Sequence, residues 1–146
     1  MERYIIRWDW RALSDNRHFP WSLDIIEHHK GELNWNRMSQ NPKLPWSIEF
    51  LESYEEYWNW FAVSSASYLP WSIELIERFE HRLDWERLSE HDGLPWSVEL
   101  MERFEDRWNW GRLSKNRGLR LPRLSQSEIS EVMIFHARPE NLAQEC

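Results

Sequence analysis

Apolar residues of the chain recur at helical spacing. Starting after Ser72, the apolar positions Leu75, Ile76, Phe79 and Leu83 form one stripe, and most positions between them are polar. This spacing predicts an amphipathic helix of about 12 residues, about 18 Å long. Ser72 has the hydroxyl that an N-cap needs, and the Pro-Trp step before it suits a helix entry.

A second, shorter helix is predicted directly after the first. It runs from Trp85 to about Ser89 and buries Trp85 and Leu88. The residue before it is always an aspartate or an asparagine, and both are strong N-caps. The residues at this position are Asp9, Asn34, Asn59, Asp84 and Asn109.

The same pair of helices recurs at a step of 25 residues. Pro-Trp-Ser begins at Pro20, Pro45, Pro70 and Pro95. Full copies therefore span residues 20–44, 45–69, 70–94 and 95–119, and residues 1–19 match the latter part of a further copy. One copy is too small to enclose its own apolar stripe, so neighbouring copies have to stack. The sequence predicts an all-α fold, an α-solenoid of 25-residue two-helix repeats over residues 1–119.

The periodicity stops after residue 119. Ser125 and Glu128 have the spacing of a capping box, which predicts a helix from about Glu128 to His136. We expect residues 120–136 to form a C-terminal segment that caps the last repeat, and residues 137–146 to form a flexible tail.

The array resembles the tryptophan-rich short repeats of uncharacterised bacterial and giant-virus proteins. The residues that carry the resemblance are Trp108-Asn109-Trp110, Leu113-Ser114 and Asn116, in alternation with Leu94-Pro95-Trp96-Ser97. It covers residues 1–119. The resemblance implies a helical repeat array, and it implies no activity and no catalytic residue.

Tryptophan stands at fixed positions in the copies. Because these rings are in phase with leucine and phenylalanine, we interpret them as a structural core shared between copies. They are Trp10, Trp35, Trp60, Trp85, Trp110, Trp21, Trp46, Trp71 and Trp96. The alternative is a platform on which nucleic-acid bases or sugars stack, but the basic residues that line a nucleic-acid groove are missing.

The composition narrows the classes of function. The chain has 18 Lys and Arg against 25 Asp and Glu, and this net charge of -7 argues against direct binding to nucleic acid or to anionic lipids. It has no apolar run long enough to span a membrane and no apolar signal core, so we expect a cytoplasmic protein. The single cysteine, Cys146, and the six scattered histidines form no ligand set, so we expect neither a metal nor a cofactor.

Two rows of acidic residues follow the copies. The first row lies near the predicted helix N-termini, where it complements the helix dipoles. In the second row, stacking would hold like charges about 10 Å apart, a repulsion that only salt screening or a partner relieves. That second row consists of Glu2, Glu27, Glu52, Glu77 and Glu102.

Negative charge is concentrated in residues 45–94. Residues 45–69 contain four glutamates and no lysine or arginine. An ordinary solvated face is the first interpretation of this charge, and a surface that binds a protein partner with a basic surface is the alternative. The candidate partner-binding residues are Glu49, Glu52, Glu55, Glu56 and Glu77.

The N-terminal half-repeat has no preceding copy to cover its apolar residues. We expect Met1, Tyr4 and Trp8 to form a self-association surface, which would make the protein a homo-oligomer. The copy at 45–69 also departs from the pattern, because Phe61-Ala62-Val63 and Ser65-Ala66-Ser67 replace a polar turn. That loop is either specialised or drifted.

These features favour a non-enzymatic, protein-binding or self-assembling repeat scaffold. The alternative is an acidic decoy that inhibits a partner protein by occupying its basic nucleic-acid channel. A hydrolase that uses surface carboxylates is disfavoured, because no two acids are placed in different environments. We predict that the protein is not an enzyme.

Overall fold

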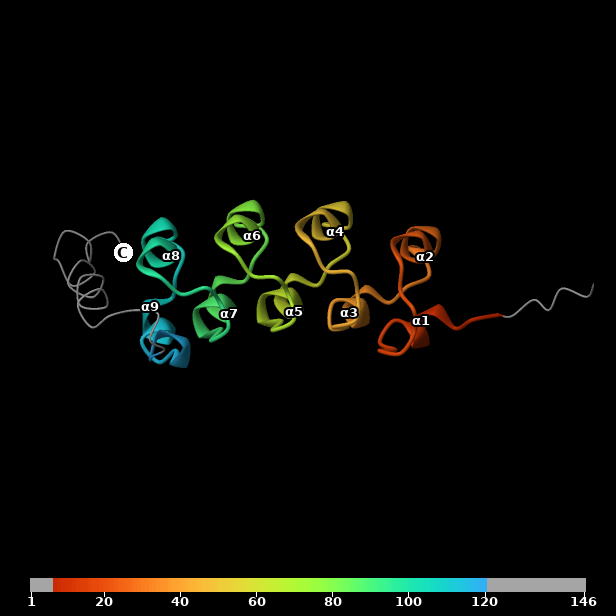
Figure 1. Ribbon diagram of the computed structural model, residues 1–146, viewed down its shortest axis with the longest axis horizontal. Coiled ribbons are helices and arrows are strands. Elements are labelled where there is room, and N and C mark those ends of the chain that lie inside the picture. The colour runs from red at the N-terminus through yellow and green to blue at the C-terminus, as the bar shows by residue number, and fades with distance from the viewer. Residues whose placement is uncertain (1–6, 121–146) are drawn as a thin grey trace, which may run out of the picture. The chain divides into compact units, whose positions relative to one another are not determined.

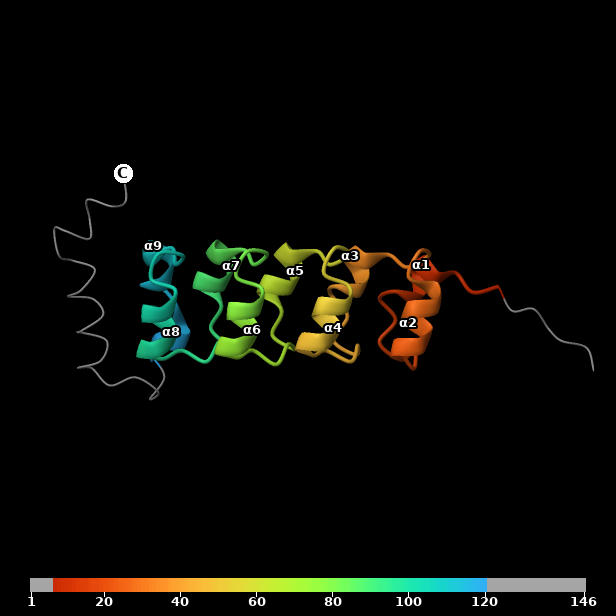
Figure 2. The same ribbon diagram turned by 90° about the horizontal axis from the view of Figure 1, so that it is seen from above.

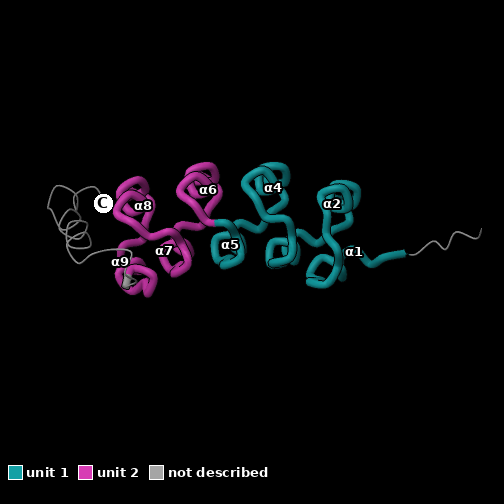
Figure 3. Tube along the Cα trace, viewed as in Figure 1, with its two compact units in different colours: residues 1–70 teal, residues 71–146 magenta. Residues whose placement is uncertain are grey.

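The computed structural model describes residues 7–120. The chain divides into two compact units, Met1–Pro70 (unit 1) and Trp71–Cys146 (unit 2), as Figure 3 shows. Across residues 7–120 the regular structure is helical and contains no strand, so the prediction of an all-α protein is confirmed.

Within residues 7–70, unit 1 has five short helices. In Figure 1, α2 and α4 lie on one side of the chain, and α1, α3 and α5 lie on the other. The helices are α1 (Trp10–Leu13), α2 (Leu23–His29), α3 (Trp35–Met38), α4 (Ile48–Ser53) and α5 (Trp60–Ser65).

Unit 2 repeats this alternation. Helices α6 and α8 lie side by side in both Figure 1 and Figure 2, and α7 contacts α9 on the other side of the chain. The elements are α6 (Ile73–Arg78), α7 (Trp85–Glu90), α8 (Val98–Arg103), α9 (Trp110–Leu113) and the 3₁₀ helix η1 (Arg117–Arg120).

The predicted helix caps are confirmed. Each of α2, α4, α6 and α8 follows a serine whose hydroxyl accepts the N–H three residues on, as Ser72 does from Leu75. The helices on the other side follow an aspartate or asparagine that does the same, as Asn109 does for Arg112. These caps satisfy amides of the first turn that have no partner within the helix.

The prediction of a helix of about 12 residues is wrong. The helices that begin after the serine caps have six or seven residues, and a turn follows each of them. The residues after α8 show why this helix is not longer. If the helix continued, the N–H of Asn109 would donate to the carbonyl of Glu105. The indole N–H of Trp110 donates to that carbonyl at 3.1 Å, and the Asn109 N–H donates to the hydroxyl of Ser89 at 2.9 Å. Both groups therefore have other partners, and the helix cannot continue through Asn109.

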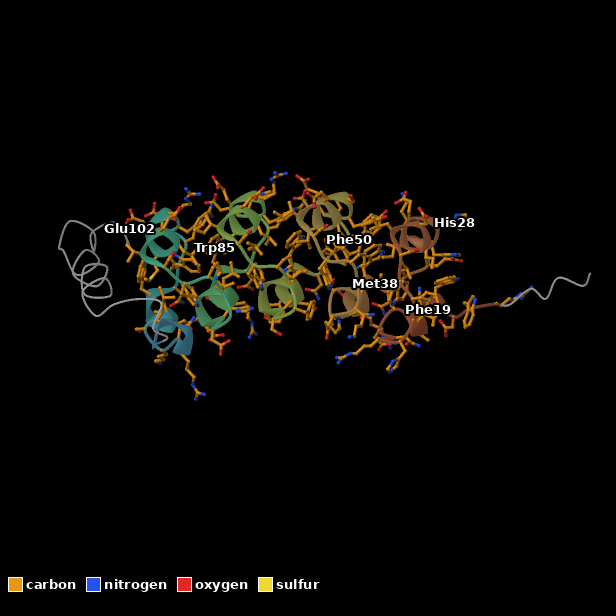
Figure 4. All side chains as sticks on the ribbon, viewed as in Figure 1. Phe19, His28, Met38, Phe50, Trp85 and Glu102 are labelled. Carbon is orange, nitrogen blue, oxygen red and sulfur yellow. The ribbon has the colours of Figure 1, made fainter. Side chains whose placement is uncertain are left out.

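The core of each unit is mainly aliphatic. Met38 and Phe50 are buried in unit 1, whereas His28 is exposed (Figure 4). In unit 2, Leu75, Ile76, Leu88, Leu94 and Leu100 are completely buried.

Some of the sequence predictions fall on residues that the structure does not describe. Apart from Arg120 in η1, the proposed capping segment 120–136 lies outside the described residues, and so does the proposed tail 137–146. Among residues 7–120, no helix is long and apolar enough to cross a membrane.

Candidate functional site

The repeated tryptophans fasten turns. Seven of them donate the indole N–H to the carbonyl five residues earlier, over 2.8 to 3.1 Å. These seven are Trp21, Trp35, Trp46, Trp60, Trp85, Trp96 and Trp110. An indole has a large apolar surface and one donor, so it can cover the core while it closes a turn.

The expectation of fully enclosed indoles therefore needs correction. Of the nine proposed core rings, only Trp96 is buried, at 2% exposure. The rings that remain partly exposed are Trp10, Trp21, Trp35, Trp46, Trp60, Trp71, Trp85 and Trp110. The sequence interpretation also missed Trp58 and Trp108, which are buried at 5% exposure each. Trp96 makes the same bond as the partly exposed rings, so the bond to a turn carbonyl is compatible with either degree of burial.

The repeated serines connect successive helix pairs. Ser39 donates its hydroxyl proton to the Trp35 carbonyl at 2.6 Å and accepts the Asn59 N–H at 2.9 Å. Ser89 makes the same two bonds in unit 2, to Trp85 and from Asn109. Each hydroxyl is thus used once as donor and once as acceptor, so these serines have a structural role.

Most of the acidic candidate residues are exposed, and one of them, Glu77, forms an ion pair within the chain. Glu49, Glu52 and Glu56 are exposed, and Glu55 is half-buried. Glu77 accepts a hydrogen bond from Arg103, over 3.0 Å between Oε2 and Nη1.

Partners within the chain relieve the expected repulsion between the acids of the second row. Glu27 accepts the Tyr54 hydroxyl at 2.7 Å and pairs with Lys30 at 2.9 Å. The Tyr54 bond, followed by Lys30, lowers the pKa of Glu27. In unit 2, the ion pair with Arg103 balances the charge of Glu77. The expectation that only salt or an outside partner balances this row is therefore wrong at these two positions.

The predicted self-association residues are only partly visible. Met1 and Tyr4 lie outside the described residues. Trp8 is 51% exposed, and its ring contacts Phe19 edge to face at 6.3 Å between centroids.

A pocket in unit 1 has walls without charge. It occupies ≈ 420 Å³, and we call it the neutral pocket. Its lining includes Gln40, Asn59, Phe61, Ala62, Ser65 and Tyr68, and none of the described lining residues is charged. Arg17 is not among them, but its positive charge acts on Tyr68. Phe61 beside it is 52% exposed.

Unit 2 has a pocket at the corresponding place in the sequence, 50 residues later. This charged pocket occupies ≈ 1040 Å³, and its walls include Glu90, Asp92, Arg112, Lys115 and Arg117. Arg112 forms an ion pair there with Glu90 and lies 3.5 Å from Glu86. The two pockets therefore occupy matching positions and have opposite chemistry.

The difference between the pockets follows from a pair of replacements. Two arginines each form an ion pair with an acid 22 residues earlier in the chain. Arg37 pairs with Asp15 at 3.6 Å, and Arg112 pairs with Glu90. At the same spacing, unit 1 has Ala62 and Gln40 in place of the arginine and the acid. Both charges are absent together, so no single charge is left without its counter-charge.

Hydrogen bonds within unit 1 hold the walls of the neutral pocket. The Tyr68 hydroxyl donates to the Ser39 carbonyl, and the Gln40 amide donates to the Asn36 carbonyl at 3.2 Å. Burial raises the pKa of Tyr68 to about 12, so the phenol stays a donor at neutral pH. The pocket is preformed rather than closed by a flexible loop.

The described residues offer little for metal or acid–base chemistry. Among residues 7–120, no group of three or more His, Cys, Asp or Glu side chains is placed to hold a metal ion.

No family model matches the chain, and neither the curated proteins nor the solved structures give a significant match to it. The site has to be interpreted from its own geometry.

Sequence reasoning noted the divergent loop at residues 61–67 but not the pocket. The signal was present, because aligning the copies shows Ala62 at the position of Arg37, Arg87 and Arg112, and Gln40 at the position of Asp15 and Glu90. What the alignment could not show is that these two positions meet.

Proposed function

We propose that the chain is a non-enzymatic, protein-binding scaffold, an α-solenoid of 25-residue repeats, whose binding surface includes the neutral aromatic face of unit 1. This face consists of residues 57–70, which contain no charged residue. In unit 2 the corresponding residues, 107–120, contain five arginines and lysines. A segment of 14 residues without a charged side chain is unusual in a chain that is 29% charged.

The observation that carries the proposal is the exposure of aromatic rings on this face. Tyr57 is 44% exposed and Phe61 is 52% exposed. The cores of protein interfaces are depleted of charge and enriched in aromatic residues. Leaving such rings in water costs free energy that burial against a partner recovers, at about 25 cal/mol per Å².

The internal bonding supports a scaffold as well. Serines 39 and 89 use their hydroxyls to join helix pairs 20 residues apart, so their chemistry serves the structure. Repeated contacts between sequence neighbours are the way in which helical repeat arrays obtain their stability. An extended array leaves most of its side-chain surface available for a partner.

The test compares the full chain with a variant that copies unit 2. Tyr57→Arg with Phe61→Gly introduces the residues found at Arg107 and Gly111. We expect a partner captured from the native host by chemical cross-linking to bind the purified parent chain and to bind the variant at least tenfold more weakly. If every captured protein binds both forms equally, the neutral aromatic face is not the binding surface.

The acidic decoy is the second candidate. It is favoured by α4 and the turn after it, where Glu49, Glu52, Glu55 and Glu56 occur without any lysine or arginine in residues 45–69. Decoy binding to a basic channel would weaken steeply as salt is raised. Glu52→Gln with Glu55→Gln and Glu56→Gln would abolish it, whereas binding by the neutral face would survive both changes.

Self-assembly through Trp8 is a separate proposal within the scaffold class. Sedimentation velocity over a range of protein concentrations tests it. A monomer at tens of micromolar removes it, and that result leaves the binding of other proteins unaffected.

A further inference from the structure

The neutral pocket is uncharged because one pair of positions in the series carries no charge on either side. Where Arg112 and Glu90 line the corresponding pocket of unit 2, unit 1 has the short Ala62 and the uncharged Gln40. Replacement of only the arginine or only the acid would leave the other charge in the pocket wall. A larger apolar residue in place of Ala62 would fill the pocket. The two replacements together leave an open and uncharged pocket.

We infer that the neutral pocket receives an uncharged, apolar side chain, aromatic or branched aliphatic, from a segment of the bound protein. This inference rests on the proposed function, because it names the chemistry of the partner at that same face. The pocket volume of ≈ 420 Å³ lies within the range of about 300 to 1,000 Å³ that is usual for ligand pockets.

The walls select against charge. A charged side chain entering the pocket would lose hydration and meet no counter-charge among the described lining residues. Phe61, Ala62 and Ala66 offer apolar contact instead. The charged pocket of unit 2, with Arg112, Lys115 and Arg117, has the opposite preference.

The rim can also bind the main chain of such a segment. The Gln40 amide nitrogen donates to the Asn36 carbonyl, so the amide oxygen is oriented by that bond and can accept an N–H. The Ser65 hydroxyl donates to the Phe61 carbonyl at 3.3 Å and keeps its acceptor capacity. Because these groups are already held in place, the segment orders few protein side chains on binding.

The probe is a library of random peptides displayed on phage and selected against the full chain. The enriched peptides are then synthesised and titrated by fluorescence anisotropy. Two variants change the pocket in different ways: Gln40→Glu with Ala62→Arg introduces the charged pair of unit 2 into its walls, and Ala62→Leu fills the space without charge. Lys115→Ser in the charged pocket is the matched control, since serine is the residue at the corresponding position 65. Circular dichroism establishes that each variant keeps the parental helix content.

We expect enriched peptides to share an uncharged apolar anchor, to bind equally at low and high salt, and to lose at least tenfold in affinity to both pocket variants. The Lys115→Ser control should bind like the parent. Enriched peptides that are basic, or that bind the pocket variants as well as the parent, overturn the inference. If binding is lost in Tyr57→Arg with Phe61→Gly but kept in both pocket variants, the inference fails while the proposed function stands. If no peptide binds saturably, both fail.

Discussion

The Tyr68 hydroxyl donates a hydrogen bond to the main-chain carbonyl of Ser39, in the place where other copies use an asparagine. Asn41 and Asn116 each donate the side-chain amide to the carbonyl of the serine 27 residues earlier, at 3.1 and 2.8 Å. The copy at 45–69 has Ala66 at the asparagine position. Tyr68 thus restores the donor that Ala66 lacks, and the loop gains an uncharged surface without leaving that carbonyl unpaired.

Removal of this donor should destabilise unit 1. We expect Tyr68→Phe to lower the free energy of unfolding by about 1 to 3 kcal/mol, because the Ser39 carbonyl loses its partner. Adding Ala66→Asn to that variant should recover part of the loss, since asparagine makes this bond at the equivalent positions. Urea denaturation followed by circular dichroism measures both effects. A Tyr68→Phe variant as stable as the parent would show that the hydroxyl bond contributes nothing.

Stability should fall at high pH because two tyrosines resist ionisation. Burial raises the pKa of Tyr68 to about 12, and burial followed by the Glu27 hydrogen bond raises that of Tyr54 to about 12, from an ordinary value of 10.0. Below pH 10 both phenols are neutral in the folded and the unfolded chain, and their contribution is fully present. Between pH 10 and 12 the unfolded chain loses these protons first, so the free energy of unfolding decreases.

Ultraviolet absorbance of tyrosinate, recorded against pH, follows these groups directly. Tyr54→Phe and Tyr68→Phe should each remove one late-titrating group and make the decline in stability less steep. If the late-titrating absorbance is the same in both variants as in the parent, the raised pKa values belong to other residues.

The caps could be predicted from the sequence because they are local. Ser72 bonds to the N–H of Leu75, three residues away, and the sequence alone places both groups in one turn. The helix length could not be predicted in this way. It depends on Asn109 meeting Ser89 and on the direction of the Trp110 N–H, and neither follows from apolar periodicity.

The exposure of the tryptophans could likewise not be predicted from the sequence. Their positions indicated burial, because hydrophobic pattern counts an indole as a large apolar group. The N–H of Trp85 instead bonds to the Glu80 carbonyl, and the ring is half-exposed. The neutral pocket could not be predicted from the sequence either, because it depends on Gln40 and Ala62 lying together in space.

The serine hydroxyls that connect successive helix pairs should contribute measurably to the free energy of unfolding. We expect Ser39→Ala to cost about 1 to 3 kcal/mol, because the buried hydroxyl bonds both the Trp35 carbonyl and the Asn59 N–H. Ser114→Ala is the matched control: that serine is exposed, and within residues 7–120 its hydroxyl bonds only to the Gly111 carbonyl, so the expected cost is below about 0.5 kcal/mol. Chemical denaturation of the two variants compares them. Equal costs would mean that the bond to Asn59 has no net value.

Trp58 and Trp108 are a natural pair for measuring an indole hydrogen bond. Both are 5% exposed, and each contacts two other tryptophan rings. The Trp58 N–H donates to the Leu51 carbonyl at 3.1 Å, whereas the Trp108 N–H has no partner among the described residues. Replacement by phenylalanine removes the same volume from both sites.

We therefore expect Trp58→Phe to cost about 1 to 2 kcal/mol more than Trp108→Phe, since only the first breaks a hydrogen bond and the second removes an unsatisfied donor. Thermal and urea unfolding of both variants provide the comparison. Costs that are equal, or larger for Trp108, would contradict this account.

Gly118 lies where no side chain fits. A Cβ atom there would come within 2.6 Å of the Asp92 carbonyl oxygen and within 2.7 Å of Trp96 Cδ1. Trp96 is the one buried ring among the repeated tryptophans, so it has no free space into which to move. We expect Gly118→Ala to cost about 1 to 3 kcal/mol through displacement of η1 or of this indole.

Gly31→Ala is the control for this change. Nothing lies within 4 Å of the position of its Cβ, so alanine there should be neutral or should stabilise by up to about 1 kcal/mol, because it restricts the unfolded chain. The midpoint of urea unfolding orders the parent and the two variants. Fluorescence adds a second reading, since displacement of Trp96 should expose an indole to water and shift the emission to longer wavelength. A Gly118→Ala protein with the parental midpoint and emission would show that η1 does not pack tightly on Trp96.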